Sequence, residues 1–203
     1  MIYFFLCLAI GFAYVAPIGL QNLFVINTAL TQPMRRVYAT ALIVIFFDVT
    51  LALACFWGVG AIMSAAKWLE MTILCLGSLI VIGIGVSLVR AKDSMSDAAD
   101  VNIPLFKVVS SACVLTWFNP QALIDGSMML GASRAALPEG ESLSFILGIT
   151  SASILWFLGV STGISIFKSK ITNKMLRVIN ITCGLVIIFY GLKLGISFVS
   201  MLK

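Results

Sequence analysis

The stretch FNPQALID, residues 118–125, places Asn119, Pro120 and Asp125 within about two helical turns of an otherwise apolar region. Asn followed by Pro is the pairing expected of a helix N-cap and the first residue of the helix. We therefore expect one helix to end here and another to begin at Pro120, inside an apolar segment. Backbone amides at such a helix start carry partial positive charge and can bind an anionic group.

The composition around this stretch is that of an integral membrane protein. Hydrophobic residues make up 61% of the 203 residues and charged residues only 10%, well below the roughly one quarter that is typical of soluble domains. The apolar runs exceed the roughly 18 residues that a helix needs to cross a bilayer. They also lack the alternation of membrane strands. The sequence therefore predicts an all-α membrane protein and argues against a barrel.

Six apolar runs are each long enough to cross a bilayer. They cover residues 2–30, 37–63, 68–89, 106–131, 143–167 and 178–201. We interpret residues 1–92 and 105–203 as two three-helix repeats, joined by a polar cytoplasmic linker at residues 93–104. Because each half has an odd number of spans, the second repeat must lie inverted relative to the first. The alternative is a chance resemblance between Gly-rich apolar segments.

The basic residues predict which loops face the cytoplasm. The first, third and fifth connections hold Arg35, Arg36, Arg90, Lys92, Lys107, Lys168, Lys170, Lys174 and Arg177, and the other two hold Lys67 and Arg134. By the positive-inside rule the odd connections are cytoplasmic and both termini lie outside. The net charge of +5 is thus a signal of orientation, and no nucleic-acid partner is indicated. A re-entrant first or fourth run would reverse one end of this topology.

Several kinds of chemistry are excluded by the residue types present. The chain has no histidine, which removes Ser-His-Asp and Cys-His catalysis and the commonest zinc sites. No Walker motif occurs, and we expect no cofactor. We interpret the five cysteines, which lie in separate apolar runs without CxxC spacing, as packing residues. They are Cys7, Cys55, Cys75, Cys113 and Cys183. The first apolar run lacks a basic leader and continues to Leu30, so we expect a membrane helix rather than a cleaved signal peptide.

Two aspartates lie within apolar runs, Asp48 in the second and Asp125 in the fourth. Asp48 lies roughly 16 Å along its helix from the cytoplasmic end, which is close to the bilayer midplane. A carboxylate there costs about 2.5 to 3.5 kcal/mol on insertion scales. That cost favours a functional role for the two acids. The alternative is a structural acid that is hydrogen-bonded to a neighbouring helix.

The first apolar run contains a second interruption. The stretch APIGLQN, residues 16–22, places Pro17 close to Gln21 and Asn22, although Ala16 is a poorer cap than Asn119. Two broken helices could present their positive ends to a carboxylate, while Asp48 and Asp125 bind cations. This arrangement is complementary to an α-amino acid with a cationic side chain. Simple proline kinks in continuous helices are the alternative.

Two further features are open to a structural interpretation. Trp117 and Phe118 flank the second interruption, where they could line a gate, although large aromatic residues in a membrane bundle more often pack. The pairs Gly159 with Gly163 and Gly191 with Gly195 have GxxxG spacing, which indicates close helix packing. Association of the chain into a homodimer is left open.

These stretches resemble the LysE/ArgO family of basic amino-acid exporters. The resemblance covers essentially the whole chain and is carried by APIGLQN, FFDVTLAL, TWFNPQALID, SASILWFLG and KMLRVINITCGLVI. It implies export of arginine and lysine across a bacterial inner membrane, coupled to ion gradients. Leu20 stands where family members commonly carry the second proline of a PxGPQN pattern. Relatives that export neutral amino acids usually read NPK, so Asp125 favours the basic branch.

Export of a cation requires an energy source. Moving one positive charge outward costs about 2.3 kcal/mol per 100 mV of inside-negative potential, so uniport would accumulate arginine or lysine. We expect Asp48, Asp125 or both to alternate between substrate and proton, which gives antiport.

Three other functions are compatible with parts of the pattern. The first is a similar exporter of neutral amino acids or of metal cations, the latter using the acids with Met128 and Met129. The second is an intramembrane aspartyl protease with Asp48 and Asp125 as its dyad, although the GxGD context of such proteases is missing. The third is a scaffold subunit without transport activity.

Overall fold

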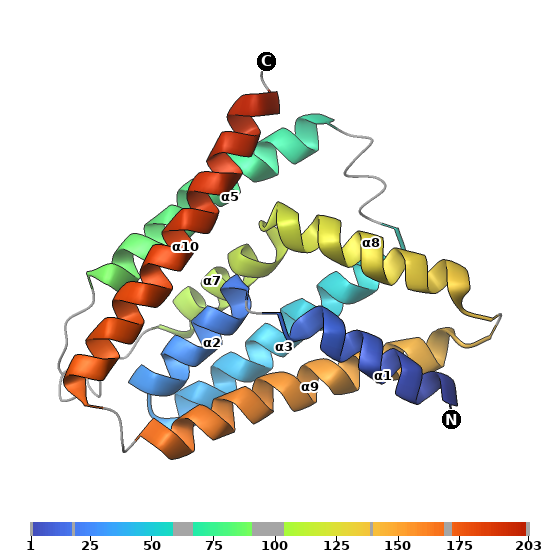
Figure 1. The fold of residues 1–203 in the computed structure, drawn as a ribbon, viewed down its shortest axis with the longest axis horizontal. Helices are drawn as coiled ribbons and strands as arrows, with labels where there is room; N and C mark the ends of the chain where they lie inside the picture. Colours follow the sequence, from blue (N-terminus) through green and yellow to red (C-terminus); the bar gives the residue numbers. More distant parts are fainter. Residues whose placement is uncertain are drawn as a thin grey trace.

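The computed structural model of the chain describes residues 2–17, 19–58, 67–90, 104–138, 140–168 and 172–201. Within these residues all regular structure is helical (Figure 1). The helices are α1 (Ile2–Val15), α2 (Leu20–Thr31), α3 (Met34–Phe56), α5 (Lys67–Val89), α7 (Leu105–Trp117), α8 (Pro120–Ala136), α9 (Ser142–Phe167) and α10 (Asn173–Met201). The prediction of an all-α chain is confirmed. Except for Pro104, the predicted linker at residues 93–104 lies outside the described residues.

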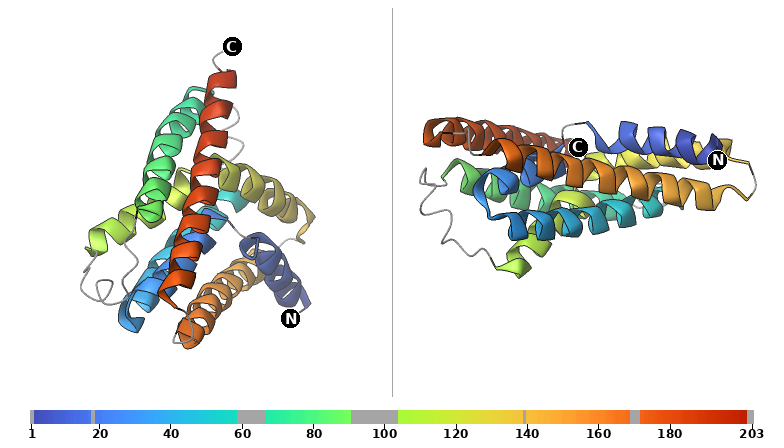
Figure 2. Two further views of the ribbon diagram at one scale, coloured as in Figure 1. Left: turned by 60° about the vertical axis from the view of Figure 1, so that its left-hand side comes forward. Right: turned by 90° about the horizontal axis from the view of Figure 1, so that it is seen from below.

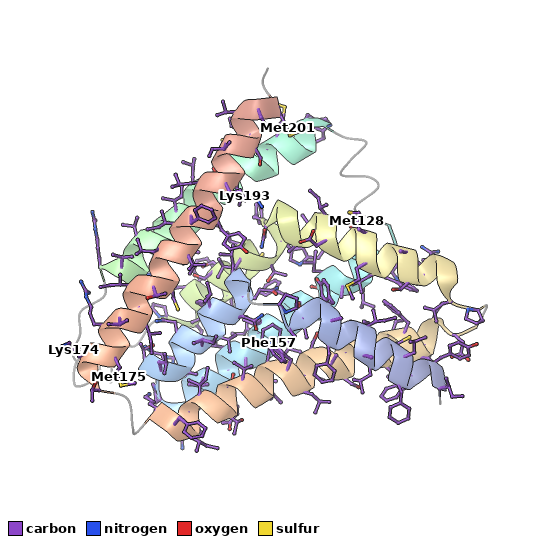
Figure 3. All side chains as sticks on the ribbon, viewed as in Figure 1. Met128, Phe157, Lys174, Met175, Lys193 and Met201 are labelled. Atoms are coloured by element: carbon purple, nitrogen blue, oxygen red, sulfur yellow. The ribbon has the colours of Figure 1, made fainter. Side chains whose placement is uncertain are left out.

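The helices and the molecular surface are those of a membrane protein. Among the described residues, Met34–Phe56, Ser142–Phe167 and Arg177–Met201 are long and apolar enough to cross a membrane, and α1 with α2 forms a further candidate that is sharply bent. Side chains made mostly of carbon cover the outside of the helices (Figure 3). Met128 is 71% exposed and Phe106 is 82% exposed. Large apolar side chains displayed so widely are suited to lipid rather than water.

Both predicted interruptions are present. α7 ends at Trp117 and α8 begins at Pro120, as the Asn-Pro pair predicted. In the first half α1 ends at Val15, and α2 begins at Leu20 with Gly19 as its N-cap. The expectation that Ala16 and Pro17 would start this helix is therefore wrong, because the chain runs through Pro17 before it turns helical again.

The second apolar run is shorter as a helix than the sequence suggested. The sequence predicts a run to residue 63; α3 ends at Phe56, and residues 59–63 lie outside the described residues. Gly58 has a φ of 94°, a left-handed conformation that glycine adopts without steric cost and that commonly ends helices. The amide of Gly58 donates to the Cys55 carbonyl at 3.1 Å, which closes the last turn.

Two antiparallel helices, α3 and α9, form the centre of the fold. Tyr38 lies beside Thr162 near one end of this pair, and Phe56 lies beside Phe145 near the other. α1 and α2 pack against α9, while α7 and α8 pack against α3. α5 and α10 form a separate long pair, which lies side by side in Figures 1 and 2.

Small residues let α5 and α10 approach closely. A Cβ at Gly191 would lie 2.6 Å from Ile82 Cγ1 and 3.3 Å from the Ser78 carbonyl oxygen. The interpretation of the Gly191 spacing as a close helix contact is confirmed. Gly159 and Gly163 make no such close contact, because no described atom would come within 4 Å of a Cβ added at either residue.

The ends of the helices divide into two groups. The connection between α2 and α3, the end of α5, the start of α7, the end of α9 and the start of α10 all lie at the left of Figure 1. A hydrogen bond joins two of these places, since Lys168 Nζ donates to the Gln32 carbonyl at 2.7 Å. The helix ends that flank the three basic connections therefore lie on one side of the molecule.

Candidate functional site

The first interruption is held together by Asn22. Its Nδ2 donates to the carbonyls of Val15 at 3.0 Å and Pro17 at 2.8 Å, which lie beyond the hydrogen-bonding ladder of α1. On the other side Trp156 Nε1, from α9, donates to Asn22 Oδ1 at 2.8 Å. Asn22 is only 4% exposed, so a buried amide replaces the hydrogen bonds that the break removes.

Leu20 occupies the first position of α2, where a proline would fit the helix without losing a hydrogen bond. The departure from the family pattern noted at this residue therefore falls at a position that tolerates either residue. Leu20 is 1% exposed and packs in an apolar cluster with Val81 and Ile187. Its side chain joins α2 to the α5 and α10 pair.

The second interruption has the predicted cap. Asn119 is the N-cap of α8, and its side chain accepts from the Ala122 amide at 3.5 Å. Pro120 is the first residue of that helix, where its missing N–H costs nothing. Just before the break, Trp117 Nε1 donates to Thr50 Oγ1 on α3 at 3.3 Å, which ties the end of α7 to the central pair.

Asp48 is buried between these interruptions. It lies on α3, is 1% exposed, and accepts a hydrogen bond from Ser153 Oγ on α9. Gln21, at the start of α2, is within hydrogen-bonding reach of the same carboxylate. Gln21 Nε2 also donates to Thr116 Oγ1, near the end of α7, at 2.8 Å. The carboxylate therefore lies beside Gln21, which joins the two broken segments through its hydrogen bond to Thr116.

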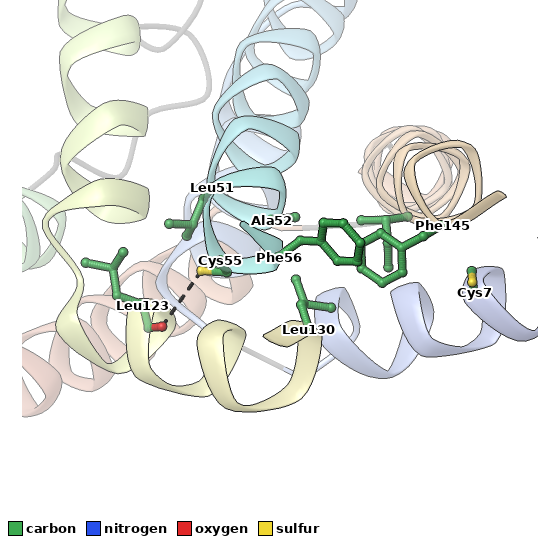
Figure 4. Close-up of a cluster of buried hydrophobic side chains, with 9 residues drawn as sticks. Cys7, Leu51, Ala52, Cys55, Phe56, Leu123, Leu130 and Phe145 are labelled. Carbon is green, nitrogen blue, oxygen red and sulfur yellow. Dashed lines mark hydrogen bonds between the residues drawn. The ribbon is translucent and has the colours of Figure 1, made fainter. Parts of the chain in front are cut away.

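We call this group the central polar layer. Its members are Gln21, Asn22, Asp48, Thr116, Ser153 and Trp156. Towards the C-terminal end of α3 it is covered by an apolar cluster that includes Phe56, Leu130 and Phe145 (Figure 4). Towards the N-terminal end of α3 a second cluster includes Val44 and Phe157. Phe157 is fully buried, and Figure 3 shows it in the interior. Apolar clusters therefore lie on both sides of the polar layer.

Asp125 does not share this environment. It lies on α8 one turn after Pro120, and its side chain is exposed. Asp48 is therefore buried within the protein and Asp125 is not, while both lie within the apolar runs in which the sequence places them. A residue's depth along an apolar run can be read from sequence, but the direction in which its helix face points depends on packing. Met128, one turn further along α8, points outward (Figure 3).

Tyr14, which no sequence pattern marks, lies near both aspartates. It lies in the last turn of α1 and within electrostatic range of both Asp48 and Asp125. A Cβ added at Gly126, the residue after Asp125, would lie 3.2 Å from Tyr14 Cε2 and 3.0 Å from Cys55 Sγ. The aromatic ring thus packs on bare backbone beside Asp125. No local motif marks such a tyrosine, because its position arises from the contact between α1 and α8.

The breaks and the buried acid define the class of the protein. Interrupted membrane helices that meet beside a buried carboxylate are characteristic of secondary transporters. The LysE type translocator family matches residues 12–197, and the chain belongs to this family. It is therefore a membrane transporter and not an enzyme.

Several arginine exporters are similar to the chain. The arginine exporter protein ArgO of Escherichia coli strain K12 is 30% identical over 200 residues, which cover 95% of this chain and 93% of the relative. The ArgO proteins of Shigella flexneri and of Klebsiella pneumoniae strain 342 show the same identity and coverage. No solved structure matches the chain.

Proposed function

We propose that this protein exports arginine, and with it lysine or related basic amino acids, from the cytoplasm in exchange for protons. The similar proteins named as arginine exporters support the substrate class. The observation that carries the proposal is Asp48, a carboxylate that is 1% exposed and accepts a hydrogen bond from Ser153. It lies beside Gln21, whose hydrogen bond to Thr116 joins the two interrupted segments. A buried acid in this position binds a cation or a proton, and the exchange of one for the other is antiport.

The two ends of the substrate meet opposite charges in this proposal. The starts of α2 and α8, near Gln21 and Asn119, offer partial positive charge to the substrate carboxylate. Asp48 binds a cationic group in the interior, and Asp125 binds the other cationic group on the exposed side of α8. Pro17, Asn22 and Pro120 shape the two helix starts rather than contact the side chain of the substrate.

The membrane arrangement that we propose is six spans in two inverted repeats, residues 1–92 and 105–203. Reciprocal packing supports this, because the broken pair of each half lies on the central helix of the other half, α9 or α3. The position on one side of the helix ends that flank the basic connections supports cytoplasmic odd loops and outside termini. The protein would then be a multi-pass protein of the bacterial inner membrane.

The test is efflux of labelled amino acids from vesicles that contain the purified protein. Wild type should export arginine and lysine and leave threonine and a divalent metal ion inside. Asp48→Asn should abolish export, whereas Glu141→Gln, which removes an acid at the start of α9, should leave it unchanged. Export of threonine instead would favour a neutral amino-acid exporter, and export of the metal would favour a cation exporter.

Coupling needs a separate measurement. An imposed proton gradient, acid outside, should accelerate arginine export, and collapse of both the pH gradient and the membrane potential should stop net export against a concentration gradient. Uphill export that persists without either gradient would contradict proton exchange and leave the substrate assignment intact. Asp125→Asn measured alongside Asp48→Asn shows whether both acids are needed.

A further inference from the structure

Helix α9 contacts the site through two side chains on one face. Ser153 Oγ donates to Asp48 Oδ2 on α3, and Trp156 Nε1 donates to Asn22 Oδ1 on α2. Residues three apart in a helix lie on the same face. One turn of α9 therefore contacts both the buried acid and the residue that seals the first interruption.

The hydrogen bond of Ser153 is unusual within this chain. Hydroxyls in membrane helices commonly donate to a carbonyl three or four residues earlier in the same helix. Thr28, Thr31 and Ser133 do so, with distances of 2.7 to 2.9 Å between the hydroxyl oxygen and a carbonyl oxygen of the same helix. Ser153 is 1% exposed and donates its single proton across to the carboxylate instead. The Ser153 hydroxyl thus bonds to the Asp48 carboxylate on α3 rather than to a carbonyl of its own helix.

Trp156 completes the hydrogen bonding of Asn22. The indole N–H is a donor only, so it must face the oxygen of the amide. With that oxygen engaged, Asn22 Nδ2 is directed at the carbonyls of Val15 and Pro17. The orientation of the whole amide, and with it the path of the chain between α1 and α2, is fixed from α9.

We propose that Ser153 and Trp156 are positioning residues for substrate binding. They hold the Asp48 carboxylate and the start of α2 at a fixed separation, so that both ends of one amino acid can be bound at once. The inference rests on the proposed function. It adds to that function a role for α9, a helix that is not itself interrupted. Ser153 acts through Asp48, and Trp156 acts through Asn22.

The experiment measures the arginine concentration for half-maximal export and the maximal rate in vesicles. Ser153→Ala and Trp156→Phe should each raise the half-saturating concentration on the order of five- to tenfold, which is the usual effect of losing one buried hydrogen bond. The maximal rate should change less than about twofold, since the carboxylate itself is retained. Ser153→Thr keeps the hydroxyl and should restore near wild-type binding. Leu155→Ala alters the exposed face of the same turn and should have no effect.

A double-variant comparison tests the Trp156 contact itself. If the indole acts through Asn22, combining Trp156→Phe with Asn22→Ala should weaken binding no more than Asn22→Ala alone. Additive effects would overturn the inference for Trp156. Wild-type half-saturation in Ser153→Ala and Trp156→Phe would overturn the whole inference and leave the proposed function standing. Absence of basic amino-acid export by wild type would overturn the proposed function first.

Discussion

Phe56 and Phe145 stack with their ring centroids 4.1 Å apart and their planes 22° from parallel. Both are almost completely buried, and they join the end of α3 to the start of α9 (Figure 4). Asp48 lies about two turns before Phe56 on α3, and Ser153 lies about two turns after Phe145 on α9. The stack therefore covers one side of the central polar layer. It contributes packing energy, and we expect it to hinder the passage of ions at that end.

Phe145→Ala should destabilise the protein by about 3 to 5 kcal/mol, the usual cost of removing a large buried aromatic side chain. The thermal unfolding midpoint in detergent should fall clearly, and vesicles containing the variant should leak protons faster. Leu147→Ala, on the half-exposed face of the same helix, is the control and should change neither. A barrier elsewhere is indicated if proton leak stays at the wild-type level in the destabilised variant.

The contact between α5 and α10 allows a comparison of two nearby glycines. A Cβ at Gly85 would lie 2.7 Å from Ile188 Cγ1 and 2.9 Å from the Gly184 carbonyl oxygen, whereas one at Gly83 would meet no described atom within 4 Å. Gly85→Ala should force the helices apart and lower the unfolding midpoint. Gly83→Ala should be neutral or slightly stabilising, because alanine favours helix. Equal midpoints for the two variants would contradict the close antiparallel contact.

Gly126→Ala should reduce export with little loss of stability. The new methyl group would lie 3.0 Å from Cys55 Sγ and 3.2 Å from Tyr14 Cε2, so the Tyr14 ring beside Asp125 has to move. Arginine efflux should fall severalfold, and Cys55→Ala in the same chain should restore part of it by making room. Gly159→Ala, which meets open space, is the matched control. Full activity of Gly126→Ala would show that the position of Tyr14 is unimportant for transport.

The local parts of this structure were predictable from sequence. Asn119 followed by Pro120 identifies a helix start by the chemistry of two adjacent residues, and it was placed correctly. Asp48 lies far inside an apolar run, so its depth along α3 follows from the sequence, although its burial depends on how α3 packs. These features depend on neighbours in the chain, where capping and length rules apply directly.

The contacts between distant helices were not predictable in the same way. Ser153 meets Asp48 across 105 positions, and Trp156 meets Asn22 across 134. The sequence around Ser153 and Trp156 does not predict which helix these side chains contact. The exposure of Asp125 has the same origin, since the rotation of α8 about its axis is set by packing on α3 and not by its own sequence.

Arg134 provides a last prediction, at the end of α8. Its guanidinium carbon lies 4.6 Å from the centroid of Trp57 and 5.6 Å from that of Phe56. Its Nη1 also donates to the Phe56 carbonyl at 3.5 Å, where α3 ends and carbonyl groups lack helical partners. One side chain therefore combines cation–π contact with capping of the central helix.

Arg134→Gln should cost about 1 kcal/mol of stability, because a cation–π contact at a partly exposed position is worth roughly 0.5 to 1 kcal/mol. Arg134→Lys should retain part of this, since lysine keeps the charge but loses the planar stacking group. The measurement is the denaturation midpoint in mixed micelles, with Lys193→Gln on an exposed face of α10 as the charge-matched control. If Arg134→Gln and Lys193→Gln shift the midpoint equally, net charge rather than the contact with Trp57 and Phe56 determines the effect. A larger shift for Arg134→Gln that is partly recovered by lysine identifies Arg134 as the link that holds α8 against the end of α3.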